Sequence, residues 1–138
     1  MSDITIKVFV RGPEGRFLSA ADVEKEPALV AAPKYRFAAN PPGGLTITDD
    51  IELLQVEDSL ADAADFFLYT LPQELKARRG ATYSFRTGPE TTVVDIEGDV
   101  AVVTGYDGTR LAVAADALAA ALEAALSQYE ALYRLLSS

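Results

Sequence analysis

The chain has 138 residues, of which 49% are hydrophobic and 24% are charged. This composition fits one compact globular domain and excludes a disordered, collagenous or low-complexity chain. The sequence contains no histidine, no cysteine and no tryptophan, and its single methionine is the first residue. Catalysis by a Ser-His-Asp triad or by a Cys-His pair is therefore excluded, because neither the imidazole nor the thiol is present.

Acidic residues outnumber basic residues by 21 to 12, which gives a formal net charge of −9. A surface of this sign repels the phosphate backbone of nucleic acids and is complementary to a basic protein. The N-terminus shows no basic segment followed by an apolar one, and no stretch approaches the length of a membrane span. We therefore expect a soluble cytoplasmic protein whose partner is another protein, and no contact with nucleic acid or membrane.

The first elements are short and end at clear turn signals. Apolar residues alternate from Ile4 to Val10, which predicts a strand with one face on a core. The turn residues Gly12–Gly15 then allow Arg16–Leu18 to return antiparallel. Ser19, followed by Asp22, resembles a capping box and predicts a short helix.

Apolar alternation resumes at Tyr35 and Phe37 and predicts another strand. The run Asn40–Gly44 should end it, because neither a helix nor a central strand tolerates consecutive prolines followed by glycines. We expect this strand to form a hairpin with a second strand over Leu45–Leu54.

The segment Asp58–Gly80 carries the signals of a helix at both ends. Asp58 or Ser59 can cap its start, and Gly80 supplies a left-handed stop. Apolar side chains recur on one stripe at helical spacing, which places that face on the core. Pro72 should kink or split the helix near Thr70.

The last third of the chain predicts strands and a long helix. Short turns separate four expected strands, which are Thr82–Arg86, Thr91–Glu97, Val100–Tyr106 and Thr109–Val113. An alanine-rich amphipathic helix follows over Leu118–Leu136. The predicted fold is α+β, in a single domain over residues 1–138: an antiparallel sheet of hairpins and a meander, with two main helices packed on one face.

Motifs for cofactors and metals are absent from the sequence. No glycine-rich phosphate-binding pattern occurs, so we expect no nucleotide cofactor. Alternating acids begin at Asp95, but Tyr106 occupies the position at which a calcium-binding EF-hand loop carries its bidentate glutamate. We therefore assign no catalytic residue, no metal ligand and no cofactor, and we predict that the protein is not an enzyme.

Acidic residues and tyrosines supply the candidate partner-binding residues. Residues 49–65 include seven acids with no intervening base, and the acids at 95, 97 and 99 are expected on one face of a strand. Two tyrosines one turn apart on the last helix could form an exposed aromatic pair. The alternative is that these acids only serve a helix N-terminus and solvated strand edges. The candidates are Asp49, Asp50, Glu52, Glu57, Asp95, Glu97, Asp99, Tyr129 and Tyr133.

Residues 45–138 resemble the small acidic immunity-type proteins that accompany polymorphic or contact-dependent bacterial toxins. The resemblance is carried by the net charge and by the order of the elements, which are Ser59–Arg79, Tyr83–Phe85, Val93–Ile96, Val100–Gly105 and Leu118–Leu136. It implies a bacterial toxin-neutralising protein without catalytic residues, which occludes a basic surface of its toxin.

Two other functions stay open on the sequence alone. One is a small-molecule-binding or carboxylate-based enzymatic domain with a pocket between sheet and helices, which a buried acid of raised pKa would favour. The other is a homodimeric structural module held together through the alanine-rich C-terminal helix.

Overall fold

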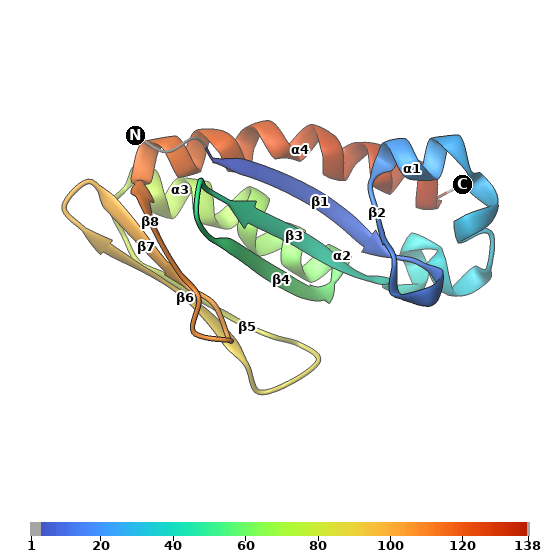
Figure 1. Ribbon diagram of the computed structural model, residues 1–138, viewed down its shortest axis with the longest axis horizontal. Coiled ribbons are helices and arrows are strands. Elements are labelled where there is room, and N and C mark those ends of the chain that lie inside the picture. The colour runs from blue at the N-terminus through green and yellow to red at the C-terminus, as the bar shows by residue number, and fades with distance from the viewer. Residues whose placement is uncertain (1–3, 138) are drawn as a thin grey trace.

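The computed structural model describes residues 4–137 and contains two four-stranded antiparallel sheets (Figure 1). Sheet A has the strand order β2-β1-β3-β4, and sheet B has the order β5-β6-β7-β8. The predicted α+β class is confirmed, with antiparallel strands and two main helical stretches packed on them. The strands divide between two sheets, a division that hairpin patterns do not specify.

The strands of sheet A are β1 (Thr5–Arg11), β2 (Phe17–Leu18), β3 (Pro42–Thr48) and β4 (Leu53–Ser59). Those of sheet B are β5 (Ala81–Ser84), β6 (Thr91–Glu97), β7 (Val100–Thr104) and β8 (Arg110–Ala114). The main helical elements are α1 (Ala20–Lys25), α2 (Leu60–Ala64), the π-helical segment η5 (Asp65–Thr70), α3 (Leu71–Lys76) and α4 (Ala115–Ser137). Short 3-10 turns are η1 (Pro13–Gly15), η2 (Pro27–Val30), η3 (Pro33–Tyr35) and η4 (Phe37–Ala39).

The capped helix α1 forms where the sequence predicts it. The Asp22 backbone N–H donates to the Ser19 hydroxyl over 3.2 Å, and the Ser19 N–H donates to the Asp22 carboxylate over 2.9 Å. These reciprocal bonds complete a capping box. The preceding strand β2 also pairs antiparallel with β1 as expected, with Val10 opposite Leu18.

The expected strand through Tyr35 and Phe37 is wrong. These residues belong to the 3-10 turns η3 and η4, and Asn40 ends η4 in the left-handed region at φ 57°. The Phe37 ring packs on Tyr133 of α4, with 4.5 Å between ring centroids. The apolar spacing here therefore serves contacts with a distant helix and not strand pairing, which periodicity alone does not distinguish.

Pro42, Gly43 and Gly44 open the central strand β3, at the place where the sequence predicts a break. Pro42 is the first residue of the strand, a position at which a missing N–H is tolerated. A Cβ atom on Gly44 would lie 1.8 Å from the carbonyl oxygen of Val56, so no side chain fits there. Glycine is present because the neighbouring strand approaches too closely, and it does not end the strand.

The single strand expected over Leu45–Leu54 is two strands. Strand β3 ends at Thr48, the chain turns, and β4 returns antiparallel with Leu53 opposite Thr48. The Asp49 carboxylate accepts hydrogen bonds from the backbone N–H groups two and three residues later, at 2.8 and 2.7 Å. This side-chain turn closes the β3–β4 hairpin. Strand β3 therefore pairs with β4 and β1, and not with residues 35–37.

The middle helix begins at its predicted cap and ends differently. The Ser59 hydroxyl accepts from the Asp62 backbone N–H over 3.2 Å. The π-helical segment η5 ends at Thr70, close to Pro72, where the sequence predicts a kink or a split. The left-handed residue beyond the helix is Arg78, at φ 57°, and not the expected Gly80.

The helices and both sheets share one continuous core. Segments α2, η5 and α3 cover one face of sheet A and lie behind β3 and β4 in Figure 1, while α4 runs along β1. Buried residues of both sheets join the buried faces of these helices in one cluster. The apolar stripe of α4 lies in this cluster, so a dimer through α4 would use its remaining polar side. Among residues 4–137, no helix has the length and apolarity to cross a membrane.

Candidate protein-binding surface

Two exposed apolar side chains mark the turn between β3 and β4. Ile51 is 87% exposed and Leu53 is 56% exposed. Asp49, Asp50 and Glu52 flank them, and the turn itself contains no basic residue. A lone exposed aliphatic residue is ordinary on a protein surface. Two of them at one turn among carboxylates form a small amphipathic projection, which we call the hairpin surface (residues 49–53).

The three acids of the hairpin surface have different roles. The Asp49 carboxylate accepts hydrogen bonds from the backbone N–H groups of Glu52 and Ile51, which lower its pKa and keep it ionised. Asp49 therefore shapes the turn. Within the described chain, the carboxylates of Asp50 and Glu52 form no ion pair. These two negative charges are available to a partner.

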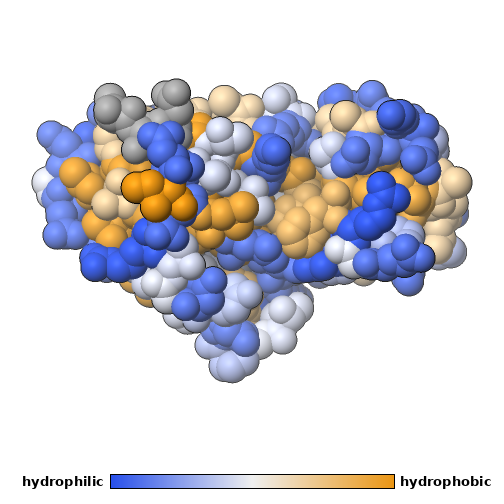
Figure 2. All heavy atoms as spheres, in the orientation of Figure 1, coloured by the Kyte–Doolittle hydropathy of each residue, from blue (hydrophilic) through white to orange (hydrophobic). Residues whose placement is uncertain are grey.

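Glu57 lies farther along β4, on the open face of sheet A. It forms a two-pronged ion pair with Arg11, in which Arg11 Nε lies 2.7 Å from Glu57 Oε2. The Arg11 guanidinium also lies 4.3 Å from the ring centroid of Phe17. Figure 2 shows this face, on which apolar areas alternate with polar ones. The negative charge of Glu57 is therefore balanced by Arg11, and it contributes less than the hairpin acids to the attraction of a basic partner.

Asp95 and Glu97 lie on a separate surface, the outer face of sheet B. Asp95 is opposite Val102 in the register, and Glu97 is opposite Val100. A shallow hollow on this face is lined by Glu97, Val100, Val102, Arg110 and Ala112. The two carboxylates thus border an apolar strip, on a different sheet from the hairpin surface.

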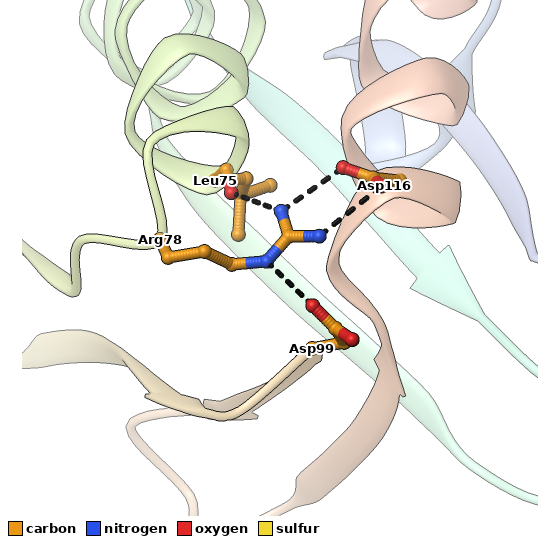
Figure 3. A network of polar contacts seen from close by, with 4 residues as sticks. All are labelled: Leu75, Arg78, Asp99 and Asp116. Atoms are coloured by element: carbon orange, nitrogen blue, oxygen red, sulfur yellow. Dashed lines mark hydrogen bonds and ion pairs between the residues drawn. The ribbon is translucent and has the colours of Figure 1, made fainter.

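Asp99 does not share that face, because β6 ends at Glu97 and Asp99 lies in the following turn. The Arg78 guanidinium binds Asp99 over 3.2 Å and Asp116 over 3.0 and 3.1 Å (Figure 3). Arg78 also donates to the carbonyl oxygen of Leu75 over 2.8 Å. Asp99 therefore helps to hold the end of α3, the β6–β7 turn and the start of α4 together.

The acids of residues 49–65 do not form one cluster, since Asp58 is only 2% exposed. Asp58 accepts hydrogen bonds from the Tyr83 hydroxyl and from the backbone N–H groups of Arg86 and Thr87, the latter two at 2.8 and 3.1 Å. Burial by itself would raise the pKa of Asp58, but these hydrogen bonds outweigh it and the pKa is lowered. Burial raises the pKa of the Tyr83 hydroxyl, and the hydrogen bond to Asp58 and then the charge of Asp58 raise it further. Asp58 is an ionised anchor between the two sheets and lacks the raised pKa of a general acid.

The two predicted tyrosines lie together on α4 and differ in exposure. Tyr129 is 9% exposed and Tyr133 is 46% exposed. They line a cleft between η5 and α4, together with Asp65, Tyr69, Glu130 and Arg134. Asp65 and Tyr69 are not among the residues predicted from the sequence, although their spacing of four residues is a signal for a shared helical face.

The exposed residues Ile51 and Leu53 are also absent from the candidates predicted from the sequence. Treating residues 45–54 as one strand placed these side chains on a regular sheet. The adjacent aspartates at 49 and 50 are the signal that could have located the turn.

Within residues 4–137 no group of three or more potential ligands is arranged to hold a metal ion. Comparisons with protein-family models, curated proteins and solved structures returned no match.

Proposed function

We propose that the protein is a non-enzymatic binding module that docks a basic protein through the hairpin surface. The observation that carries this proposal is the 87% exposure of Ile51 at a turn whose neighbouring Asp50 and Glu52 carboxylates have no ion-pair partner in the described chain. An exposed aliphatic side chain contributes affinity when a partner covers it. The adjacent charges select partners of opposite sign.

Charge and apolar contact have separate roles in this proposal. The net charge of −9 attracts a basic protein over a distance set by the electrostatic screening length. That length is about 8 Å at physiological ionic strength. Covering Ile51 and Leu53 contributes about 1–3 kcal/mol for each side chain. Association should therefore depend on salt, whereas dissociation should depend on the two aliphatic residues.

The most specific form of the proposal is a cytoplasmic immunity protein that neutralises a bacterial toxin by covering a basic surface. The acidic charge, the order of the elements and the hairpin surface support it. A catalytic role for Asp58 has no similar support, because its carboxylate is bound by three donors and has a lowered pKa.

Affinity capture from the source cells, with two baits, tests the docking surface. The first bait is the unchanged chain, and the second is the Ile51→Asp, Leu53→Asp variant, whose substitutions lie on exposed positions. We expect the first bait to retain a basic protein that the second bait loses. Retention of the same proteins by both baits, or capture of an acidic protein, would contradict the proposal.

Association kinetics with the captured protein test the role of charge. Asp50→Lys with Glu52→Lys should slow association about tenfold at low salt, and much less at high salt. Asp49 is left unchanged because it holds the turn. The matched control is Asp95→Lys with Glu97→Lys, which changes the net charge equally on the other sheet. Equal slowing by both pairs would mean that only the net charge governs association and would contradict a specific role for Asp50 and Glu52.

A growth assay tests the immunity form separately. Production of the captured protein alone should arrest cells, and its production together with this chain should restore growth. If the captured protein is harmless, the immunity form is wrong, while the docking surface stands on the capture and kinetic results.

A further inference from the structure

A tyrosine-lined cleft between η5 and the C-terminal half of α4 lies outside the hairpin surface. Tyr69 comes from η5, and Tyr129 and Tyr133 come from α4, one turn apart. Asp65 precedes Tyr69 by four residues, so both side chains project from the same side of the π-helical segment. π-Helical segments are rare and often occur at functional sites.

Three tyrosine rings, those of Tyr69, Tyr129 and Tyr133, line this cleft. The Tyr69 and Tyr129 centroids are 6.5 Å apart, and the ring planes are nearly perpendicular, at 83°. Phe37 supports the α4 side, with its centroid 4.5 Å from that of Tyr133 and 6.1 Å from that of Tyr129. Tyr129 is almost fully buried, whereas Tyr69 and Tyr133 are each about half-exposed. The cleft therefore exposes the rings of Tyr69 and Tyr133 to solvent, while Phe37 and the buried Tyr129 hold them in place.

Aromatic faces carry a negative electrostatic potential and attract cations, most strongly when several rings surround one charge. The carboxylates of Asp65 and Glu130 add two negative charges at the cleft, against one positive charge from Arg134. Neither carboxylate forms an ion pair within the described residues. The pKa of the Tyr129 hydroxyl is raised to about 12, first by burial and then by electrostatic interaction with Tyr69, Asp65 and Tyr133. The negative charge of Asp65 is therefore felt inside the cleft.

We propose that this cleft receives the cationic end of a lysine or arginine side chain from the basic partner. The proposal rests on the docking function described above and specifies one anchor of that partner. Tyrosine rings contact the alkyl part and the charged end, and the two carboxylates select a cation over an uncharged side chain of similar shape.

Small probes test the cleft without the partner. In NMR titrations of the full chain, Nα-acetyl-lysine-N-methylamide and its arginine counterpart should shift the ring signals of Tyr69 and Tyr133, with half-saturation at roughly 10 mM. The norleucine counterpart has a similar length and no charge, and it should produce no saturable shift. Binding of norleucine as tight as that of lysine, or no saturable shift with any probe, would overturn the proposal.

Phosphocholine distinguishes a second source of organic cations, a lipid headgroup. Tighter binding of phosphocholine than of the lysine and arginine probes would overturn the assignment to a protein side chain. Weaker binding, which its phosphate should cause beside two carboxylates, would support it.

Variants connect the signal to particular residues. Tyr69→Leu keeps apolar bulk but removes the ring and should weaken lysine binding about fivefold, and Asp65→Asn should weaken it by a similar factor. Tyr106→Leu is the matched control, because Tyr106 is an exposed tyrosine in the turn between β7 and β8, outside the cleft. Equal weakening by Tyr106→Leu would contradict the site.

The hairpin variant Ile51→Asp, Leu53→Asp separates the two proposals. It should lose the protein partner and retain lysine binding, because the cleft shares no residue with the hairpin surface. Loss of probe binding in Tyr69→Leu with an unchanged circular dichroism spectrum would place the effect in the cleft. If the spectrum of Tyr69→Leu is altered, Asp65→Asn provides the test instead, because it changes an exposed carboxylate and leaves the aromatic packing intact. Unchanged lysine binding by Asp65→Asn would then contradict the proposal.

Discussion

The Asp58 carboxylate accepts a hydrogen bond from the Tyr83 hydroxyl inside the protein and joins the last strand of sheet A, β4, to the first strand of sheet B, β5. Backbone N–H groups of Arg86 and Thr87 complete its coordination. The Tyr83 ring also packs on Phe67, at 5.4 Å between centroids. A charged group and an aromatic ring thus fix the same junction between the two sheets.

Asp58→Ala should destabilise the protein by about 3 kcal/mol, because three donors lose a buried acceptor. Tyr83→Phe should cost only about 1 kcal/mol, since the ring packing stays and the two backbone donors still satisfy Asp58. Urea unfolding of both variants and of the double variant measures the coupling between them. Additive effects would show that the hydroxyl and the carboxylate act independently and would contradict this junction.

Stability should also fall in acid because of Asp58. Its folded pKa is lowered below that of an unfolded aspartate, so its contribution is present above about pH 4 and is lost as the pH falls through the folded value. The difference in unfolding free energy between the unchanged chain and Asp58→Asn should therefore shrink below about pH 4. Urea unfolding between pH 3 and 7 checks this. A difference that grows in acid would reverse the sign of the pKa shift.

The turn signals of the sequence located much of the fold. The Ser19 capping box and the short turn expected between Glu97 and Val100 depend only on a few adjacent residues, and both form as predicted. Contacts between distant elements caused the errors. Tyr35 and Phe37 alternate like strand residues, but their spacing serves ring contacts with the core and with α4. Gly44 resembles a strand breaker in the sequence, but it is a glycine because the backbone of the neighbouring strand lies too close for a side chain.

The candidate site was also predictable only in the part that depends on adjacent residues. The acids of the hairpin surface were predicted from charge alone, and Asp49, Asp50 and Glu52 do lie together. Asp99 was not separable from them by sequence, because Arg78, the residue that binds it, lies 21 residues away. Patterns of charge identify acids, but only the fold shows which of them already have a partner.

Gly44→Ala should destabilise the protein by more than about 3 kcal/mol. The added Cβ would lie 1.8 Å from the Val56 carbonyl oxygen and 2.9 Å from its carbon, and both atoms belong to the backbone of the paired strand. Gly98→Ala is the matched comparison, because that glycine has φ 64° and nothing within 4 Å of an added Cβ. It should cost only about 1 kcal/mol, from backbone strain. Thermal unfolding of both variants checks the order, and equal costs would contradict the close approach at β3.

The side chain of Gln128 covers the free edge of β1. Its Oε1 accepts from the Val8 backbone N–H and its Nε2 donates to the Ile6 carbonyl, both over 2.9 Å. Strand β2 pairs with β1 only at Val10 and Arg11, so the edge at residues 6–8 has no strand beside it. The amide thus provides the donor and the acceptor that a neighbouring strand would supply.

Gln128→Leu should therefore destabilise the protein by about 2–3 kcal/mol and favour aggregation, because it leaves the Val8 N–H and the Ile6 carbonyl unpaired at an edge. Gln128→Glu keeps the acceptor for Val8 and loses the donor for Ile6, so its effect should be smaller. Gln73→Leu, at an exposed glutamine of α3, controls for the change in polarity. Urea unfolding and light scattering at rising protein concentration measure the two effects. Equal behaviour of the Gln128 and Gln73 leucine variants would show that the edge of β1 does not need this amide.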